Sequence, residues 1–515
     1  MRTLYADIIV IGGSLGGVMA ALAAAKMGKT VILTEETSWI GGQLTSQAVP
    51  PDEHKWIEEF GCTATYREFR NNVRDYYREN YPLLKDSERL NPGNAWVSRI
   101  SHEPRVALQM LENMLAPYVS SGRVNILLNH LPVRATVEDD TVTSVTVSSK
   151  EEIELRGQFF LDATECGDVL PLAGVEYVTG AESKVETGEL HAPDEPNQQD
   201  MQPITHVFAC EYREGEDHTI SKPEQYDFWK QYQAPFLQHK QLSWFAPDAD
   251  TGGSKEFAMF HKGDLWGLWD YRRIIDKDMY TPGHYKGDIS LINWPQNDYW
   301  LGSIIDVSPQ ERAKHIESAK QLSLSLLYWL QTEAGYPGLR LRGDLVGTDD
   351  GLAMYPYIRE SRRIRAMFTV VEEHISAETR GKAGIARFDD SVGIGAYRID
   401  LHPTIETNSF FYTTSYPFEI PLGSLIPIRV KNLLPACKNI GTTHITNGCY
   451  RVHPVEWNIG ESVGYLAAFA AEKGVLPRDI RRNKDLLKEF QHLLKNQGIP
   501  LHWDQLPNNG VGSAI

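Results

Sequence analysis

The sequence has few of the features that mark disulfide-stabilised, membrane-spanning or nucleic-acid-binding proteins. Its five cysteines are scattered and form no CxxC pair, so a reducing, cytoplasmic environment is expected. Acidic residues outnumber basic ones by 68 to 51, and the net charge of -17 argues against the basic face that nucleic acid requires. No stretch approaches the roughly 20 apolar residues of a membrane span. We expect a globular chain of 515 residues with two or more lobes.

The first 36 residues have the pattern of one strand–helix–strand unit. Residues 7–11 are a β-branched run, typical of a strand buried on both faces of a parallel sheet. Residues 18–26 predict an alanine-rich helix, and residues 30–33 predict the second strand. Glycines interrupt this apolar stretch and no basic leader precedes it, so we interpret it as part of the fold and not as a signal peptide.

The rest of the chain predicts that the C-terminal part returns to the first domain. Residues 181 to about 300 are rich in Glu, Asp, Gln, Trp and Tyr and indicate a second domain. The other expected elements are helices at 67–80 and 108–119, a strand at 125–128, a hairpin of 141–147 with 153–161 that leads back to the sheet, a long helix at 307–335, and a strand, glycine turn and alanine-rich helix within 425–475.

A glycine-rich loop connects the first strand to the helix. Gly12 and Gly17 match the first and third glycines of the G-x-G-x-x-G pattern, and Ser14 replaces the second. At such a place the backbone N–H groups and the positive end of the helix face a pyrophosphate. Glu35 ends the second strand, 18 residues past Gly17, where a carboxylate can accept hydrogen bonds from ribose hydroxyls. The alternative is an ordinary glycine turn of an α/β protein.

A second glycine pair, Gly41-Gly42, follows that acid and precedes Gln43. With the first loop and Glu35 it resembles the two-dinucleotide, glutathione-reductase-like flavoproteins. Segments 161–168, 357–363 and 433–440 extend the resemblance to the FAD-dependent oxidoreductase family over most of residues 5–475. The chain departs from the family's common pattern at Glu165-Cys166, where a glycine is frequent.

The resemblance implies an α/β fold in which a discontinuous Rossmann-like FAD-binding domain, residues 1–180 and 401–480, carries an inserted α+β substrate or cap domain at 181–400. A C-terminal helix and tail follow at 481–515. FAD is the implied cofactor. The residues implied or expected to contact it are Gly12, Ser14, Leu15, Gly16, Gly17, Glu35, Glu36, Gly41, Gly42, Gln43, Val133, Ala163, Thr164, Gly167, Lys438 and Asn439. No second strand–G-x-G-x-x-G–helix unit occurs, so a tightly held NAD(P)H is not indicated.

Arginines and a histidine are the candidate catalytic residues. Arg359 and Arg363 suit recognition of an anionic substrate, since arginine binds carboxylates bidentately. Read as a strand, the two share one face, and the structural alternative is an ion-paired strand with Glu360 as partner. His444 is preferred over His402 and His453 for proton transfer, and Tyr357 is a second choice. No HExxH, CxxC or EF-hand spacing indicates a metal site.

These patterns predict an enzyme that transfers a hydride between a small-molecule substrate and flavin N5. Two alternatives stay open. One is a binding protein with the FAD fold and no redox turnover, against which both glycine loops and Glu35 argue. The other is a flavin- or NAD-dependent enzyme without net redox chemistry. The substrate, the electron acceptor and the oligomeric state cannot be inferred from the sequence.

Overall fold

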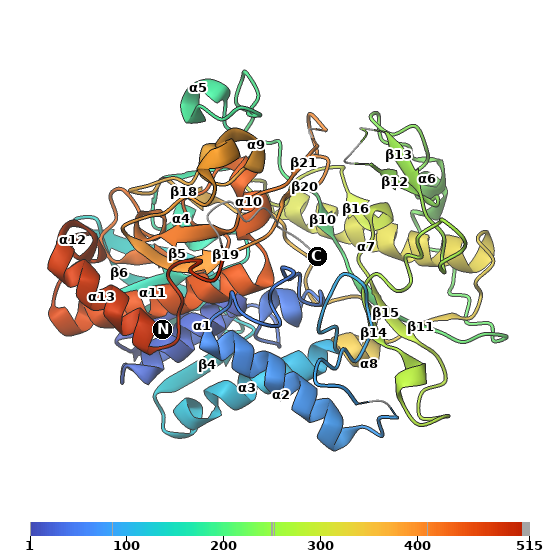
Figure 1. Ribbon diagram of the computed structural model, residues 1–515, viewed down its shortest axis with the longest axis horizontal. Helices are drawn as coiled ribbons and strands as arrows, with labels where there is room; N and C mark the ends of the chain where they lie inside the picture. Colours follow the sequence, from blue (N-terminus) through green and yellow to red (C-terminus); the bar gives the residue numbers. More distant parts are fainter. Residues whose placement is uncertain (1, 85, 249–250, 252, 409, 507–515) are drawn as a thin grey trace.

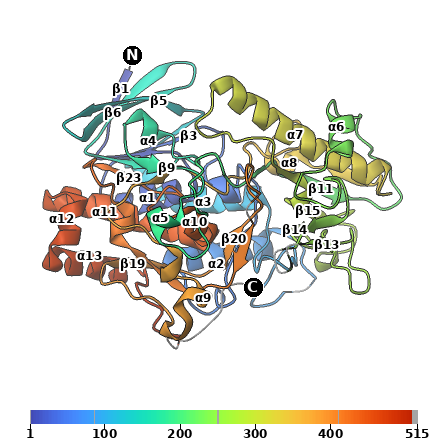
Figure 2. The same cartoon turned by 90° about the horizontal axis from the view of Figure 1, so that it is seen from above.

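The computed structural model describes residues 2–84, 86–248, 251, 253–408 and 410–506. Elements from both ends of the chain, blue and cyan with orange and red, lie together on one side of the molecule (Figure 1). Most of the green and yellow elements from the middle of the sequence lie on the other side, as the view from above also shows (Figure 2). Of the C-terminal helix and tail expected at 481–515, residues 507–515 lie outside the described residues.

A five-stranded parallel sheet underlies the first region of the described chain, in the order β23-β8-β2-β3-β4. Its strands are β2 (Ile8–Ile11), β3 (Val31–Glu35), β4 (Val124–Leu128), β8 (Phe159–Asp162) and β23 (Leu433–Pro435). All of β2 is buried, as expected for a strand covered on both faces. Because β23 pairs with β8, C-terminal residues complete a sheet that the first residues begin. The predicted discontinuous, Rossmann-like α/β fold is confirmed.

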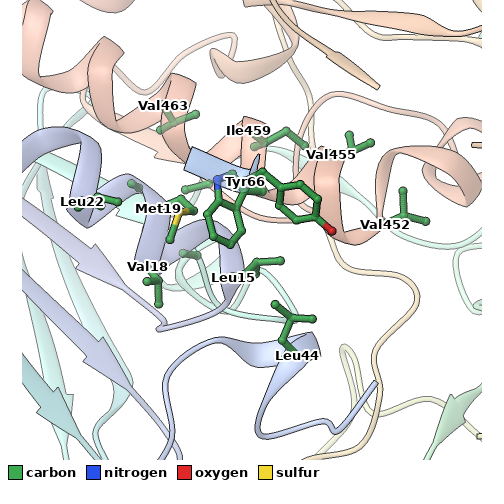
Figure 3. Close-up of a cluster of buried hydrophobic side chains, with 14 of the residues drawn as sticks. Leu15, Val18, Met19, Leu22, Leu44, Tyr66, Val452, Val455, Ile459 and Val463 are labelled. Carbon is green, nitrogen blue, oxygen red and sulfur yellow. The ribbon is translucent and has the colours of Figure 1, made fainter. Parts of the chain in front are cut away.

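Two helices from opposite ends of the sequence pack against each other beside this sheet. They are α1 (Leu15–Lys26) and α11 (His453–Lys473). Figure 3 shows Met19 and Leu22 of α1 close to Ile459 and Val463 of α11. The helices approach closely because Gly460 and Gly464 lie against the backbone of α1. This contact fixes the N-terminus of α1 relative to the C-terminal segment.

A second sheet and two helices complete the first region. The sheet has the order β1-β7-β6-β5 and contains β1 (Arg2–Tyr5), β5 (Leu131–Glu138), β6 (Thr141–Ser148) and β7 (Glu152–Arg156). The antiparallel pair of β6 and β7, followed by β8, confirms the predicted hairpin and return to the main sheet. The expected helices are α2 (Ala64–Asn80) and α3 (Pro104–Ser120). Both begin earlier than predicted, α2 at the Thr63 cap and α3 at a proline in its first turn.

The middle of the chain forms a separate hydrophobic core. An antiparallel sheet of order β14-β15-β11-β17 contains β11 (Phe208–Tyr212), β14 (Arg273–Ile275), β15 (Ile289–Ile292) and β17 (Leu339–Leu341). The predicted long helix is α7 (Pro309–Thr332), which begins with a capping box of Ser308 and Glu311. A separate core of mixed helix and antiparallel sheet is what the inserted α+β unit requires.

The segment that contains Arg359 and Arg363, read as a strand in the sequence analysis, is a strand only at β18 (Arg363–Ile364). The segment before it is irregular because Arg359 and Arg363 turn to different partners, Asp298 for the first and Glu182 with Glu360 for the second.

The remaining α-helices and strands are α4 (Val169–Leu172), β9 (Tyr177–Val178), α5 (Lys184–Thr187), β10 (Ile204–Thr205), α6 (Tyr226–Gln231), β12 (Phe245–Pro247), β13 (Ser254–Glu256), β16 (Asp298–Tyr299), α8 (Gly343–Val346), α9 (Ala377–Arg380), β19 (Ser391–Gly395), β20 (Ile399–Leu401), β21 (Phe411–Thr413), β22 (Phe418–Pro421), α10 (His444–Tyr450), α12 (Pro477–Arg482) and α13 (Lys484–Asn496).

Within the described part of the chain, each helix is too short or too polar to cross a lipid bilayer.

Candidate active site

The glycine loop brings two backbone donors to the end of β2. Ser14 caps α1, with its Oγ accepting from the amide of Gly17 at 3.2 Å. The amides of Gly12 and Gly13 donate to Thr34 Oγ1 and Glu35 Oε2. The amides of Ser14 and Leu15 find no acceptor among the described residues. These two N–H groups at a helix N-terminus suit a phosphate oxygen.

The loop glycines permit close approach of neighbouring backbone. Gly12 has a φ of +97°, and a Cβ there would lie 2.3 Å from the carbonyl oxygen of Ala163. A Cβ on Gly16 would lie 1.9 Å from the carbonyl oxygen of Ala436, and one on Gly17 would lie 2.1 Å from that of Gly12. The loop is therefore held against the ends of β8 and β23, where parallel strands of an α/β sheet bind ligands.

Glu35 ends β3 directly beside this loop. Its Oε2 accepts from the amide of Gly13 at 2.9 Å, and its Oε1 accepts from the amide and hydroxyl of Thr37 at 2.8 and 2.7 Å. Burial raises the pKa of Glu35 to about 7, although these hydrogen bonds oppose the shift. Oε2, which accepts one hydrogen bond, has a lone pair left for a ribose hydroxyl.

A cavity of about 530 Å³ opens over these groups. Of the predicted cofactor residues, six line it, namely Gly12, Ser14, Glu35, Glu36, Ala163 and Thr164. Its volume is that of a typical ligand pocket. Arg362, within the segment 357–363 that resembles the family, and Arg312 of α7 also line it, and the sequence analysis did not identify Arg312. Arg362 donates to Asp168 at 3.0 Å. No local motif marks Arg312, which reaches the cavity only through the packing of the middle region.

The second glycine pair lies against the first loop. The amide of Gly41 donates to the carbonyl of Gly13 at 2.7 Å, and both glycines have positive φ, +107° and +46°. Gln43 then donates from Nε2 to the backbone carbonyl of Arg451 at 2.9 Å and also to Glu456. Gln43 thus ties the second glycine pair to the segment between α10 and α11.

A buried ion cluster surrounds Lys438. Its ammonium pairs with Glu165, lies 3.5 Å from Glu456 Oε2 and lies 3.4 Å from the sulfur of Cys437. Burial alone would raise the pKa of Glu456, but Lys438 and the amide of Gly16 hold that pKa below its usual range. Burial also raises the pKa of the Cys437 thiol. Cys437, Glu165 and Glu456 have the spacing of metal ligands, yet the cation among them is the lysine ammonium.

The other predicted cofactor residues surround these groups. Asn439 donates to the carbonyl of Asp162 at 3.0 Å and so fixes the turn after β23 to the end of β8. Gly167 has a φ of +66° at the start of α4. Val133 lies on β5 next to Pro132, which lines the cavity, and its side chain is 37% exposed.

A chamber of about 40 Å³ has Arg451, whose backbone carbonyl accepts from Gln43, in its wall. Tyr357 and Arg359, both predicted as site residues, line it. The rest of its wall consists of Asp52, Tyr271, Arg272, Asn293, Trp294, Pro295, Tyr397, Asp400, His402 and Arg451. Arg359 donates to Thr205 Oγ1 at 2.8 Å and pairs with Asp298 at 2.9 Å. Arg451 donates to the phenol oxygen of Tyr357 at 3.0 Å.

A wider vestibule of about 260 Å³ shares Tyr271, Pro295, Asp400 and His402 with the chamber. His402 is held by a hydrogen bond of 2.6 Å between its Nδ1 and Asp298. The other ring nitrogen has no partner among the described residues, and the side chain is 24% exposed. A histidine oriented by a carboxylate with one nitrogen open has the arrangement of a general base.

The structure places His444 and Arg363 away from these cavities. His444 Nδ1 is 2.8 Å from Glu360, and Arg363 pairs with the same carboxylate and with Glu182. Burial lowers the pKa of His444, but the neighbouring carboxylate of Glu360 raises this pKa by more than burial lowers it, so the net shift is upward. These residues form a buried ion-paired cluster, the arrangement that the structural alternative for Arg363 describes. His453, the third candidate, accepts from the amide of Asp52.

Known proteins resemble the chain in sequence and in structure. Its sequence is 26% identical over 171 residues to soluble pyridine nucleotide transhydrogenases of Mycobacterium tuberculosis and Mycobacterium bovis, and the alignment spans 33% of this chain and 33% of each relative. The chain therefore spans about a third of the length of these curated relatives. Two solved structures each align with 96% of this chain. For quinol fumarate reductase of E. coli the TM-score is 0.33, the sequence identity is 10% and the alignment covers 74% of that chain. For an anhydrotetracycline hydroxylase of Streptomyces rimosus the TM-score is 0.34, the sequence identity is 11% and the alignment covers 66% of that chain.

The family model described as FAD dependent oxidoreductase matches residues 7–494. The matched residues include the glycine loop and the residues that line the cavity and the chamber. The chain accordingly belongs to the FAD dependent oxidoreductase family, and it is an enzyme with FAD as its cofactor.

Proposed function

We propose that the enzyme transfers a hydride between FAD and a small molecule bound in the chamber. The observation that carries this proposal is the link through Gln43, which hydrogen-bonds Arg451 of the chamber and Glu456 behind the glycine loop. When bound, FAD would supply a ring that accepts or donates a hydride at N5. The amides of Ser14 and Leu15, together with Glu35, would hold its ADP portion.

We assign proton transfer to His402. Its Nδ1 is fixed by Asp298, and the ring lines both the chamber and the vestibule, so its open nitrogen can receive a proton from a substrate entering by that route. Arg359, which shares Asp298 with His402, would orient the substrate. Tyr357 would contact it through a phenol oxygen that already accepts from Arg451. His444 and Arg363 receive no role because neither lines the chamber.

The visible spectrum of the purified protein tests the proposal. Flavin bands should be present, and anaerobic addition of small polyols, amines and organic acids should bleach them with one class of compound. Air should then restore them. A protein that binds FAD but whose flavin no donor or acceptor reduces or reoxidises would favour recognition without turnover and would overturn the proposal. Reduction by NADH or NADPH alone would favour the chemistry named in the transhydrogenase relatives.

Glu35→Ala is expected to weaken FAD retention. The carboxylate offers hydrogen bonds to ribose hydroxyls, and losing bonds to a charged group costs roughly 1.5–3 kcal/mol, or about a 10- to 100-fold higher Kd. The measurement is equilibrium titration of the apoprotein with FAD, followed by flavin fluorescence. Glu151→Ala, at an exposed position in the turn between β6 and β7, is the matched control. Equal affinities of the Glu35 variant and the wild type would rule out this ribose contact.

His402→Asn is expected to slow flavin reduction by about 10²- to 10⁴-fold, because asparagine can keep the bond to Asp298 but cannot take up a proton. Stopped-flow measurement of bleaching, with the compound that reduces the wild type, gives the rate. Flavin content should not change. His218→Asn is the control. His218 also bonds a carboxylate, Glu216, but it is not part of the chamber wall. A reduction rate like that of the wild type would remove His402 from the proton path.

A further inference from the structure

Three arginines of the chamber wall have unused hydrogen-bonding capacity. Arg272, Arg359 and Arg451 are each at least nine-tenths buried, and the Nε of each lacks a partner among the described residues. The amide nitrogen of Asn293, in the same wall, also lacks one. Buried N–H donors are almost always satisfied in folded proteins. Four unsatisfied donors around one small chamber therefore indicate an acceptor-rich ligand.

The charges of the three arginines are not equally compensated. Arg272 forms two parallel hydrogen bonds to Asp52, at 2.9 and 3.2 Å, and Arg359 pairs with Asp298 at 2.9 Å. Burial would raise the pKa of both aspartates, but their arginines hold it below its usual range, so both are carboxylates. Arg451 has the loosest pairing. Its nearest carboxylate oxygen, in Asp400, is 3.5 Å away, and its other chamber partner is the neutral Tyr357.

The size of the chamber limits which anion it can take. Its volume is about 40 Å³, whereas a cavity needs about 10–15 Å³ to hold one water molecule, so the chamber has room for a group of about three heavy atoms. A planar carboxylate is the smallest common anion of organic substrates, and a guanidinium matches its geometry. The body of the ligand must then extend outwards. Aromatic side chains form much of the vestibule wall there, namely Trp96, Phe257, Tyr271, Trp300, Phe410 and Tyr412.

We propose that the substrate is a cyclic carboxylic acid. Its carboxylate binds Arg451 in the chamber, with the spare donors of Arg359 and Asn293 nearby, and its ring lies against the aromatic wall of the vestibule. This inference rests on the proposed function in locating the substrate there. It adds that the carboxylate enters first, so that the ring is held beside His402 at the boundary of the two spaces. Binding itself needs no redox step and can be measured separately.

Binding of simple probes to the wild-type holoenzyme tests the substrate class. Benzoate and cyclohexanecarboxylate are compared with benzyl alcohol and benzylamine, which have similar rings without the negative charge. Quenching of tryptophan fluorescence, to which Trp96 and Trp300 contribute, and the flavin difference spectrum report binding. The carboxylates should bind about 10- to 100-fold more tightly, the ratio expected for charge-assisted hydrogen bonds. Equal or tighter binding of the alcohol or amine overturns the proposal, as does no binding of either carboxylate at millimolar concentration.

Arg451→Gln assigns the effect to one residue. The variant should bind benzoate about 10- to 100-fold more weakly while its affinity for benzyl alcohol stays unchanged. Arg340→Gln makes the same charge change at a half-exposed site outside the chamber wall and should leave both affinities unchanged. If Arg451→Gln does not fold, the preference of the wild type for carboxylates over the alcohol and amine still tests the proposal. If the flavin can be reduced but carboxylates bind no more tightly than the alcohol or amine, only this inference is rejected. If carboxylates bind selectively but the flavin is never reduced and reoxidised, only the proposed function is rejected.

Discussion

Glu456→Ala is expected to lower the free energy of unfolding by about 3–5 kcal/mol and to yield protein without FAD. Glu456 is fully buried on α11, where it accepts from the amide of Gly16 at 3.0 Å and from the thiol of Cys437 at 3.3 Å. It also compensates the ammonium of Lys438. Alanine would leave the Gly16 amide without its acceptor and Lys438 with one carboxylate for a cluster built on two. Removing one partner of a buried ion pair costs far more than the pair itself contributes.

Thermal unfolding of the apoprotein, compared with flavin content after purification, measures both effects. Glu489→Ala is the matched control. It breaks an ion pair with Lys473, the last residue of the same helix, but both side chains are largely exposed and the expected cost is below about 1 kcal/mol. Glu456→Gln keeps an oxygen that can accept from the Gly16 amide, so its loss of unfolding free energy should lie between those of the two alanine variants. Equal unfolding of the Glu456 and Glu489 alanine variants would show that the cluster does not hold the loop.

Local patterns predicted the strand–helix–strand unit and its glycine loop. The β-branched run at 8–11, the alanine-rich helix after it and the acid at Glu35 form a unit whose hydrophobic pattern, glycine turn and length agree, and the structure has that unit. The return of β23 was also predictable, because a strand followed by a glycine turn and an alanine-rich helix repeats the same pattern. In these segments the pattern that determines the structure lies within about 30 consecutive residues.

The substrate side was not predictable in the same way. The direction of Arg359 is set by Thr205 and Asp298, which lie more than a hundred and about sixty residues away in the sequence. The polar turn around His444 favoured it over His402 in the sequence, but the fold places His402 in the chamber wall and His444 against Glu360. Alternation of arginines suggested a strand, but long-range ion pairs decided the backbone path. Arg312 likewise lines the cavity above the glycine loop only because α7 packs there, and no local pattern indicates it.

Gly460→Val is expected to have the second largest effect, because the interface of α1 and α11 has no room for a side chain there. A Cβ at 460 would lie 2.1 Å from the carbonyl oxygen of Gly16, and one at Gly464 would lie 2.3 Å from that of Ala20. α1 cannot move away from α11 freely, since Gly16 is itself packed against Ala436 at the end of β23. Figure 3 shows the apolar side chains that fill the rest of this interface, including Met19 and Ile459.

The valine must therefore push the two helices apart, and the shift would displace the Ser14 and Leu15 amides from the cofactor. Overpacking costs about 1–3 kcal/mol where a core can adjust, and a clash of two backbones should reach or exceed the upper value. The thermal midpoint and the Kd for FAD measure the two consequences. Gly253→Val makes the same change where the nearest atom would be 3.4 Å away and should alter neither. FAD binding by Gly460→Val with the affinity of the wild type would mean that the cofactor does not depend on how closely these helices pack.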